Sequence, residues 1–230
     1  MIKSLINKFR SLYRFRNSDS NSINNNLVGW SNYNWTKLGE EWSNNPEWKA
    51  SVIEFILKPN IPIKSKILEI GPGGGRWTEH IITIADSLIL VDLTPQCIEI
   101  CKNRFKNYNK IQYFVNDGKS LDFIQTGSID IIWSWDVFVH IQSEDIKNYI
   151  RQFARILNKE GKAIIHHSKN GKYEAGWRSD MTAKKMVSYS NEYGLEVLEQ
   201  FVSWNEDRML IYPSLPKDQS PDIVTIIKKP

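Results

Sequence analysis

Short apolar runs alternate with helical patterns from Lys66 to the end of the chain. The runs are bounded by glycine, proline or polar residues, which is typical of buried strands, and between them apolar residues recur every three to four positions, which predicts amphipathic helices. The predicted strands are residues 67–70, 88–91, 111–115, 129–133, 163–166, 195–202 and 223–227. The predicted helices are residues 95–105, 143–157 and 181–193, with one more that follows the first strand and ends near residue 84. This alternation predicts an α/β protein whose mostly parallel sheet is covered on both faces.

The N-terminal region has a different pattern. Six apolar residues lie at helical spacing opposite basic ones: Ile2, Leu5, Ile6, Phe9, Leu12 and Tyr13. They predict a short basic amphipathic helix, which either lies on an anionic membrane surface, docks on a partner, packs on its own domain or frays. Residues 17–26 are almost entirely Asn, Ser and Asp, which predicts a solvated linker. The expected organisation is therefore an extension over residues 1–26 and one domain over residues 27–230.

The domain begins with an aromatic segment over residues 27–60, ahead of a core over residues 61–230. Its aromatic residues are Trp30, Tyr33, Trp35, Trp42 and Trp48, with Phe55 further on. A helix is predicted over residues 46–58, because Pro46 suits a first helical turn and Pro59 ends the helix.

Charge and composition restrict the class of protein. The formal net charge is +4, but residues 1–18 contain five basic residues and no acid, so the basic pI does not by itself indicate nucleic-acid binding. The two cysteines, Cys97 and Cys101, give no disulfide framework, which fits a reduced cytoplasmic compartment. No apolar run approaches the ~20 residues of a membrane span, and no signal-peptide core is present. Collagen, disulfide miniproteins, integral membrane proteins and disordered chains are excluded.

The strongest motif is a glycine-rich turn over residues 66–78, between the first strand and its helix. Such a turn brings backbone close to a ligand at the carboxyl end of a strand. A dinucleotide motif G-x-G-x-x-G that starts at Gly71 needs a small residue where Arg76 stands, so a nicotinamide dehydrogenase is disfavoured. The pattern that fits is E-x-G-x-G-x-G, formed by Glu69, Gly71, Gly73 and Gly75. A carboxylate at its start suits a cationic ligand.

This motif resembles the first motif of the class I S-adenosylmethionine-dependent methyltransferases, and the resemblance covers residues 66–161. It implies a Rossmann-like, doubly wound, seven-stranded sheet of order 3-2-1-4-5-7-6 whose last strand is antiparallel. It also implies S-adenosylmethionine as the cofactor. Asp92, at the end of the second strand, can accept both ribose hydroxyls, and Asp117 matches the position that contacts the adenine amine. Either acid alone can instead be a loop carboxylate that caps a helix or turn. The remaining residues expected around the cofactor are Leu93, Asn116, Gly118, Trp135, Tyr33 and Trp42.

The acceptor is expected beside residues 133–140, after the fourth strand. An Asn/Asp-Pro-Pro-aromatic motif, found in enzymes that methylate base amines, is missing, and so is a Pro-Cys nucleophile; no nucleic-acid substrate is therefore expected. A hydroxyl acceptor needs a base near neutral pKa. The candidate catalytic residues are His167, His166, Asp136 and His140. Adjacent residues in a strand point to opposite faces, so at most one of His166 and His167 reaches the substrate. His80 is interpreted as a surface or packing residue. No metal site is predicted.

A narrower resemblance extends over about residues 30–205. Segments around Tyr33, Gly71, Val115, Asp136, Ile165 and Trp177 look like methyltransferases of bacterial and viral glycan synthesis, including O-antigen chain-terminating enzymes and sugar O-methyltransferases. In that group an N-terminal aromatic segment closes over the cofactor, so Tyr33, Trp35 and Trp42 are candidates for a lid. Trp135 stands where phenylalanine is commoner in the group.

The acceptor wall is expected to include Trp177 and Arg178, which lie in a polar stretch after the fifth strand. Arg178 can pair with a phosphate or uronate, or be a solvated loop charge. The expected function is methyl transfer to an oxygen of a small or glycan acceptor, a sugar hydroxyl above all. The alternatives are a non-catalytic scaffold that binds the cofactor and a methyltransferase of another small molecule. The expected location is cytoplasmic, with residues 1–16 in contact with the inner face of a membrane or with a protein partner.

Overall fold

The computed structural model describes residues 21–171, 178–205 and 209–230. Its strands are β1 (Ser65–Ile70), β2 (Ala85–Asp92), β3 (Ile111–Val115), β4 (Ile129–Phe138), β5 (Leu157–Ser168), β6 (Glu196–Phe201), β7 (Ser203–Trp204), β8 (Met209–Leu210) and β9 (Asp222–Lys228). Its helical segments are α2 (Ile23–Ser31), η1 (Trp35–Lys37), η2 (Glu40–Trp42), α3 (Pro46–Val52), η3 (Ile53–Leu57), α4 (Lys58–Asn60), α5 (Thr78–Ile81), α6 (Pro95–Arg104), α7 (Ser143–Ile156), α8 (Ala183–Glu192) and η4 (Lys217–Gln219).

The fold is built on a seven-stranded sheet of order β3-β2-β1-β4-β5-β9-β6. Neighbouring strands from β3 to β5 pair in parallel, with Leu68 of β1 opposite both Ile89 and Ile132. β9 runs antiparallel to β5 and β6. Since β9 is the seventh strand of this sheet in chain order, the predicted Rossmann-like order and its antiparallel strand are confirmed.

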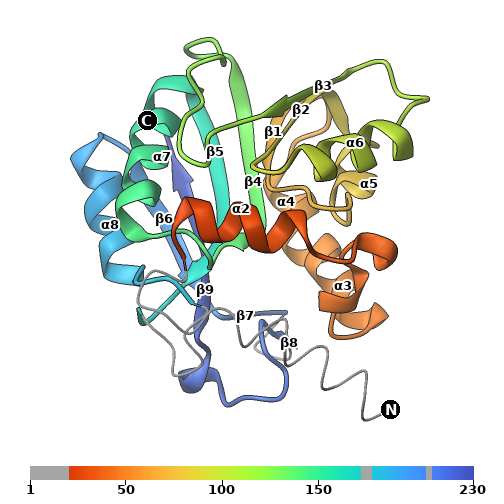
Figure 1. The fold of residues 1–230 in the computed structure, drawn as a ribbon. Helices are drawn as coiled ribbons and strands as arrows, with labels where there is room; N and C mark the ends of the chain where they lie inside the picture. Colours follow the sequence, from red (N-terminus) through yellow and green to blue (C-terminus); the bar gives the residue numbers. More distant parts are fainter. Residues whose placement is uncertain (1–20, 172–177, 206–208) are drawn as a thin grey trace.

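Helices cover both faces of the sheet, on opposite sides in Figure 1. Side chains alternate along each strand, so Trp133 of β4 packs with the cluster of α3, α5 and α6, and Ile132 packs with α7 and α8. Fully buried side chains such as Phe153 of α7 each contribute about 1.5–3 kcal/mol of stability. Figure 1 also shows α2 passing across the sheet near the ends of β4 and β5.

Several boundaries differ from the predicted ones. The helix after the glycine turn is only α5, because the preceding residues stay in turns, and β4 and β5 are longer than predicted. The predicted helix over residues 46–58 is present as α3, the π-helical η3 and α4, so Pro59 lies within the last turn rather than just after it. Cys97 and Cys101 are both free and buried.

The predicted linker is wrong for its described part, residues 21–26. Ser22 accepts the backbone N–H of Asn25 at 3.3 Å and caps α2, and the Asn26 side chain donates to the His140 carbonyl at 2.7 Å. The short polar side chain of Ser22 caps a helix, and that of Asn26 donates a hydrogen bond to a distant residue. Composition alone does not distinguish such residues from those of a solvated linker. Residues 1–16, where the basic helix is predicted, lie outside the described residues. Among those described, no helix is long and apolar enough to cross a bilayer.

Candidate active site

A cavity of about 930 Å³, part of it open to solvent, lies where β1, β2 and β4 end. The carboxyl edge of a parallel sheet is where doubly wound folds bind ligands. The lining includes predicted residues from every part of the site: Gly71, Gly73, Asp92, Leu93, Asn116, Gly118, Trp35, Trp42, Trp135, Asp136 and His140. Their side chains and backbone come from segments far apart in the sequence, and the sheet brings them together.

The floor of the cavity is the glycine turn between β1 and α5. Gly71 and Gly73 have φ angles of 70° and 55°, which only glycine adopts without strain. A Cβ atom on Gly71 would lie 2.4 Å from Val137, and one on Gly73 would lie 2.7 Å from Trp35. Gly75 is also left-handed, but its Cβ position faces Phe105, outside the residues that line the cavity. The turn therefore needs glycine both for its conformation and for its contacts.

Asp92 stands beside this floor at the end of β2. Its Oδ1 accepts the backbone N–H of Thr94 at 2.8 Å, and its Oδ2 accepts the N–H of Gly73 at 3.2 Å. Burial raises the pKa of Asp92 above its ordinary value, although these hydrogen bonds oppose the shift. Oδ1 also accepts the Thr94 hydroxyl at 2.9 Å, so the lone pair left for a ligand is on Oδ2, and Asp92 can bind the turn and accept a hydroxyl group in the cavity.

Glu69 lies behind the turn and outside the residues that line the cavity. Its Oε2 accepts the Thr78 hydroxyl at 2.7 Å, and burial raises its pKa to about 8. The structure thus places Glu69 as a support between β1 and α5, and not where a cationic ligand in the cavity would touch it.

The segment after β3 forms the side of the cavity where the adenine is predicted. Asn116 and Gly118 line the cavity, and the Asn116 amide donates to the Tyr149 hydroxyl at 2.9 Å. Asp117 is exposed and outside the lining, where its Oδ1 accepts the N–H groups of Lys119 and Ser120. The alternative role of a turn-forming carboxylate therefore describes Asp117 in this structure better than the predicted contact with the cofactor.

An aromatic lid covers the floor. Trp30, Trp35 and Trp42 line the cavity, with Trp35 and Trp42 rings edge-to-face at 5.6 Å. Tyr33 lies behind them, 5.0 Å from each of these two rings, and its hydroxyl donates to Glu41 at 2.7 Å. Two of the three predicted lid residues thus reach the cavity. Trp30 is not among the predicted lid residues, although it lies in the same aromatic segment and its position there could have indicated a place in the cavity lining.

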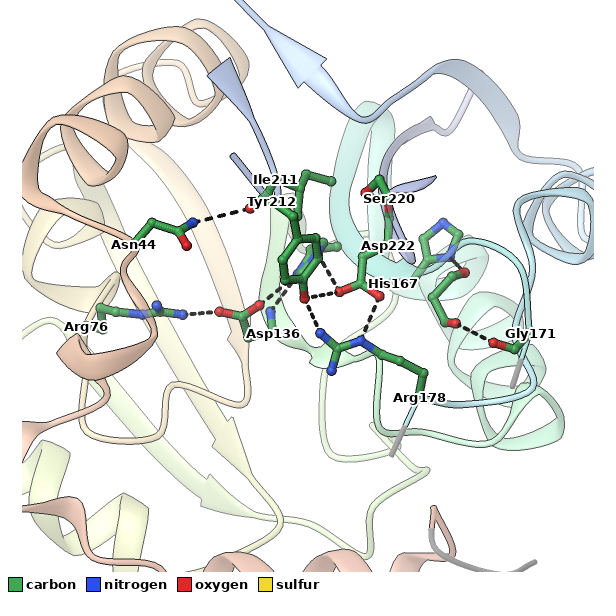
Figure 2. A network of polar contacts seen from close by, with 12 residues as sticks. Asn44, Arg76, Asp136, His167, Gly171, Arg178, Ile211, Tyr212, Ser220 and Asp222 are labelled. Atoms are coloured by element: carbon green, nitrogen blue, oxygen red, sulfur yellow. Dashed lines mark hydrogen bonds and ion pairs between the residues drawn. The ribbon is translucent and has the colours of Figure 1, made fainter. Parts of the chain in front are cut away.

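The opposite wall carries a chain of charged groups, drawn in Figure 2. Asp136, at the end of β4, pairs with Arg76 on one side, and its Oδ1 lies 3.0 Å from Nδ1 of His166 on the other. Asp136 has a φ of 61°, an uncommon conformation for a residue with a side chain. Despite burial, Arg76 and His166 hold the pKa of Asp136 well below its ordinary value.

His166 is buried behind this wall and outside the residues that line the cavity. Its ring stacks on Trp135, with centroids 4.9 Å apart, and its Nε2 lies 3.4 Å from Oδ2 of Asp222. Burial alone would lower the pKa of His166, but the two carboxylates Asp136 and Asp222 raise it above its ordinary value. His166 is thus placed to hold Asp136 and not to touch an acceptor.

Arg178 belongs to the same chain of charges. Its Nε donates to Asp222 Oδ1 at 2.8 Å, and its guanidinium also contacts the Tyr212 hydroxyl. It is buried, so neither predicted role, a ligand for an acceptor anion or a solvated loop charge, describes it. Sequence reasoning missed Tyr212 and Asp222, because they lie more than thirty positions further along the chain. Trp177 lies outside the described residues.

His167 is wrong as a candidate base. It is fully buried between β5 and β9, with Nδ1 2.7 Å from the Ser168 carbonyl and Nε2 2.7 Å from the Thr225 hydroxyl. Figure 2 shows it apart from Asp136 and Arg76. Burial lowers its pKa to about 4. His140, in contrast, lines the cavity, where its ring centroid lies 5.2 Å from that of Trp30.

The buried His167 predicts a pH dependence of stability. Its folded pKa of about 4 is below the unfolded value of about 6.5, so only the unfolded chain takes up a proton between these pH values, and stability is lost as the pH falls. We expect the wild type to lose about 2 kcal/mol of unfolding free energy between pH 7 and pH 5 relative to His167→Gln, as measured by urea titration. The contribution of His166 has the opposite sign but is common to both proteins. Parallel pH profiles would contradict a neutral, buried His167.

Among the described residues, no group of three His, Cys, Asp or Glu side chains is arranged to hold a metal ion. The polar groups of the cavity instead suit an organic ligand with hydroxyls. The glycine floor leaves no room for a Cβ atom, and Asp92 offers a free lone pair on Oδ2, so the residues present fit S-adenosylmethionine.

The fold and the lining of this cavity are similar to those of class I S-adenosylmethionine-dependent methyltransferases. Residues 67–161 match the family described as methyltransferase domain. An S-adenosylmethionine-dependent methyltransferase from Mesorhizobium loti has a similar structure, with a TM-score of 0.65 and 12% identity over 82% of this chain and 100% of that one. A likeness at this identity shows the fold.

Several curated relatives match part of the chain, and two of them are described here by name. The chain is 28% identical to a ubiquinone biosynthesis O-methyltransferase from Pelagibacter ubique, over 63% of its own length and 65% of the relative's. It is 26% identical to the protein of the same name from Xanthomonas oryzae, over 44% of its own length and 42% of the relative's. The chain thus spans about two fifths of one of these two relatives and about two thirds of the other.

Proposed function

We propose that the protein transfers the methyl group of S-adenosylmethionine to an oxygen of a small acceptor, with a sugar hydroxyl as the first choice. The observation that carries this proposal is the wall opposite Asp92, where His140 stands among indole rings. Indole faces pack against the C–H edges of a sugar, and a histidine can take the proton that the hydroxyl loses.

In this proposal the chain positions two ligands. Asp92 and the glycine turn hold the cofactor, which supplies an electrophilic methyl group when bound. The aromatic lid excludes water from the sulfonium, and His140 accepts the proton of the acceptor hydroxyl. Because the transfer is an in-line displacement, orientation accounts for much of the rate. His166 and Asp222 act by holding Asp136 in place.

A phenolic acceptor is the second candidate. It is favoured by the two relatives that are named ubiquinone biosynthesis O-methyltransferase. A flat phenol ring also suits stacking on indoles. A third candidate, a scaffold that binds the cofactor without chemistry, is compatible with the same cavity.

These candidates are separated by one experiment. The protein is incubated with methyl-labelled S-adenosylmethionine and with nucleotide sugars, oligosaccharides or catechols, and the products are identified by mass spectrometry. Labelled sugar supports the first candidate and labelled catechol the second. Cofactor binding without a labelled product from any acceptor would favour the scaffold.

His140→Gln tests the base directly. Loss of general-base catalysis typically costs 10²–10⁴-fold, so we expect kcat to fall about 100-fold at saturating cofactor while the affinity for S-adenosylmethionine stays unchanged. The same substitution at His80, which lies outside the cavity, is the matched control and should leave kcat unchanged. Normal turnover by His140→Gln would exclude His140 as the base.

A further inference from the structure

A chain of ion pairs connects the aromatic lid to three helices. Its members lie outside the residues that line the cavity and are Glu40 of η2, Lys49 of α3, Glu79 of α5 and Arg104 of α6. Lys49 Nζ lies 2.7 Å from Oε1 of Glu40 and 2.7 Å from Oε1 of Glu79. Glu79 also pairs with Arg104 through its other oxygen. We call these four residues the lid anchor.

The lid anchor also reaches the lid through the glycine turn. Arg104 Nη1 donates to the Gly74 carbonyl at 2.8 Å. A Cβ atom on Gly74 would lie 2.4 Å from Leu38 Cα, so the lid backbone lies directly against this turn. Leu38 is only two residues before Glu40, where the anchor begins. Residues 38–40 are therefore attached at one end by packing on the glycine turn and at the other end by an ion pair.

This part of the lid depends on such attachments. Leu38 and Gly39 are both left-handed, with φ angles of 56° and 86°, and a leucine keeps this conformation only where its surroundings determine it. Trp42, whose ring lines the cavity, is in the same three-residue helix as Glu40. Because so short a helix is not stable alone, the position of Trp42 depends on contacts made by its neighbours.

The geometry of Lys49 makes it the central member of the lid anchor. Its side chain is only 14% exposed, and its ammonium group lies between two carboxylates. An isolated exposed ion pair contributes little, whereas a network of charges that is partly shielded from water contributes more. Removal of Lys49 would leave Glu40 and Glu79 without the cation between them, so the lid would lose its ion pair to α3.

We propose that Lys49 is a positioning residue, which holds the aromatic lid over the bound cofactor through the lid anchor. The inference rests on the proposed use of the cavity for methyl transfer and adds to it a residue that acts from outside the cavity. Since Lys49 does not line the cavity, its effect on the cofactor passes through Glu40 and the position of Trp42.

Calorimetry on the full chain with S-adenosylhomocysteine tests the proposal without any turnover. We expect Lys49→Met to bind this ligand about tenfold more weakly and Glu40→Gln about fivefold more weakly. Glu40→Gln keeps the pair between Lys49 and Glu79, so it serves if Lys49→Met does not fold. The double variant should bind within about twofold of Lys49→Met, because the effects of two residues that act through one ion pair do not add.

A matched control and an optical readout separate positioning from stability. Glu54 pairs with Lys58 at 2.6 Å in the same segment of the chain, but neither residue lines the cavity, so Glu54→Gln should bind as the wild type does. Quenching of tryptophan emission by acrylamide should increase in folded Glu40→Gln, because Trp42 becomes hydrated, and should not change in Glu54→Gln.

Three results would overturn the proposal. They are an unchanged affinity in folded Lys49→Met and Glu40→Gln, a double variant whose loss is the product of the two single losses, and weaker binding without any change in quenching. A wild type that binds S-adenosylhomocysteine but methylates no acceptor would contradict the proposed function and leave the lid anchor standing, because none of these readouts depends on methyl transfer.

Discussion

Asp92→Ala is expected to weaken S-adenosylmethionine binding by about 100-fold. A charge-assisted hydrogen bond from the ribose to Oδ2 is worth about 1.5–3 kcal/mol, and each 1.4 kcal/mol is tenfold. The substitution also removes the acceptor of the Gly73 N–H, so the floor of the cavity loses a support. Isothermal titration calorimetry measures the loss of affinity. Asp92→Asn keeps one oxygen, so its affinity for S-adenosylmethionine should lie between those of the wild type and Asp92→Ala.

The control substitution for Asp92→Ala is at the other end of β2. Asp86 is half-buried, pairs with Lys110 at 3.2 Å and lies outside the residues that line the cavity, so Asp86→Ala should leave cofactor affinity unchanged. If Asp92→Ala binds within threefold of the wild type while still folded, the ribose does not contact Asp92 and the proposed orientation of the cofactor is wrong.

Gly74→Ala is expected to separate the lid from the glycine turn. A Cβ atom at this position would lie 2.4 Å from Leu38 Cα and 2.6 Å from its carbonyl carbon. Backbone atoms cannot rotate away, so the clash is relieved only by moving the segment between η1 and η2. Overpacking of this kind costs about 3 kcal/mol, which is more than a hundredfold in an equilibrium constant. We therefore expect a comparable loss of cofactor affinity.

Displacement of the lid has an optical signature, because Trp35 and Trp42 leave the ring cluster and become hydrated. We expect a red shift of tryptophan emission in Gly74→Ala. Gly194→Ala is the control: its φ is 72°, so the substitution is strained, but no atom lies within 4 Å of the added Cβ. It should lower stability by about 1 kcal/mol without changing emission or binding. Equal emission spectra for Gly74→Ala and the wild type would show that the lid has not moved.

The sheet was predictable because its signal is local. Each buried strand is a short apolar run, and the order of parallel strands follows from the family resemblance of the glycine turn. Lengths were harder to predict: β4 continues to Phe138 past a left-handed Asp136, where strand periodicity breaks. The linker prediction failed at Asn26, because an asparagine that donates to a distant carbonyl has the same composition as one in solvent.

The parts of the candidate site that come from a single segment of the chain could be predicted from the sequence. Gly71, Gly73 and Asp92 line the cavity as expected, since each follows directly from a strand end. The predicted acceptor wall could not be derived from the sequence, because its charged side chains pair with residues on other strands of the sheet. The residues next to His166 and Arg178 in the sequence do not indicate that Asp222 lies between these two side chains. Both side chains pair with Asp222 in the interior and therefore do not line the cavity.

Helix α2 touches both halves of the cavity. Ile23 packs at Gly118, beside the expected adenine, and Asn26 holds the carbonyl of His140 on the opposite wall. A ligand in the cavity would therefore lie beside a helix that is attached to both the predicted cofactor side and the predicted acceptor side.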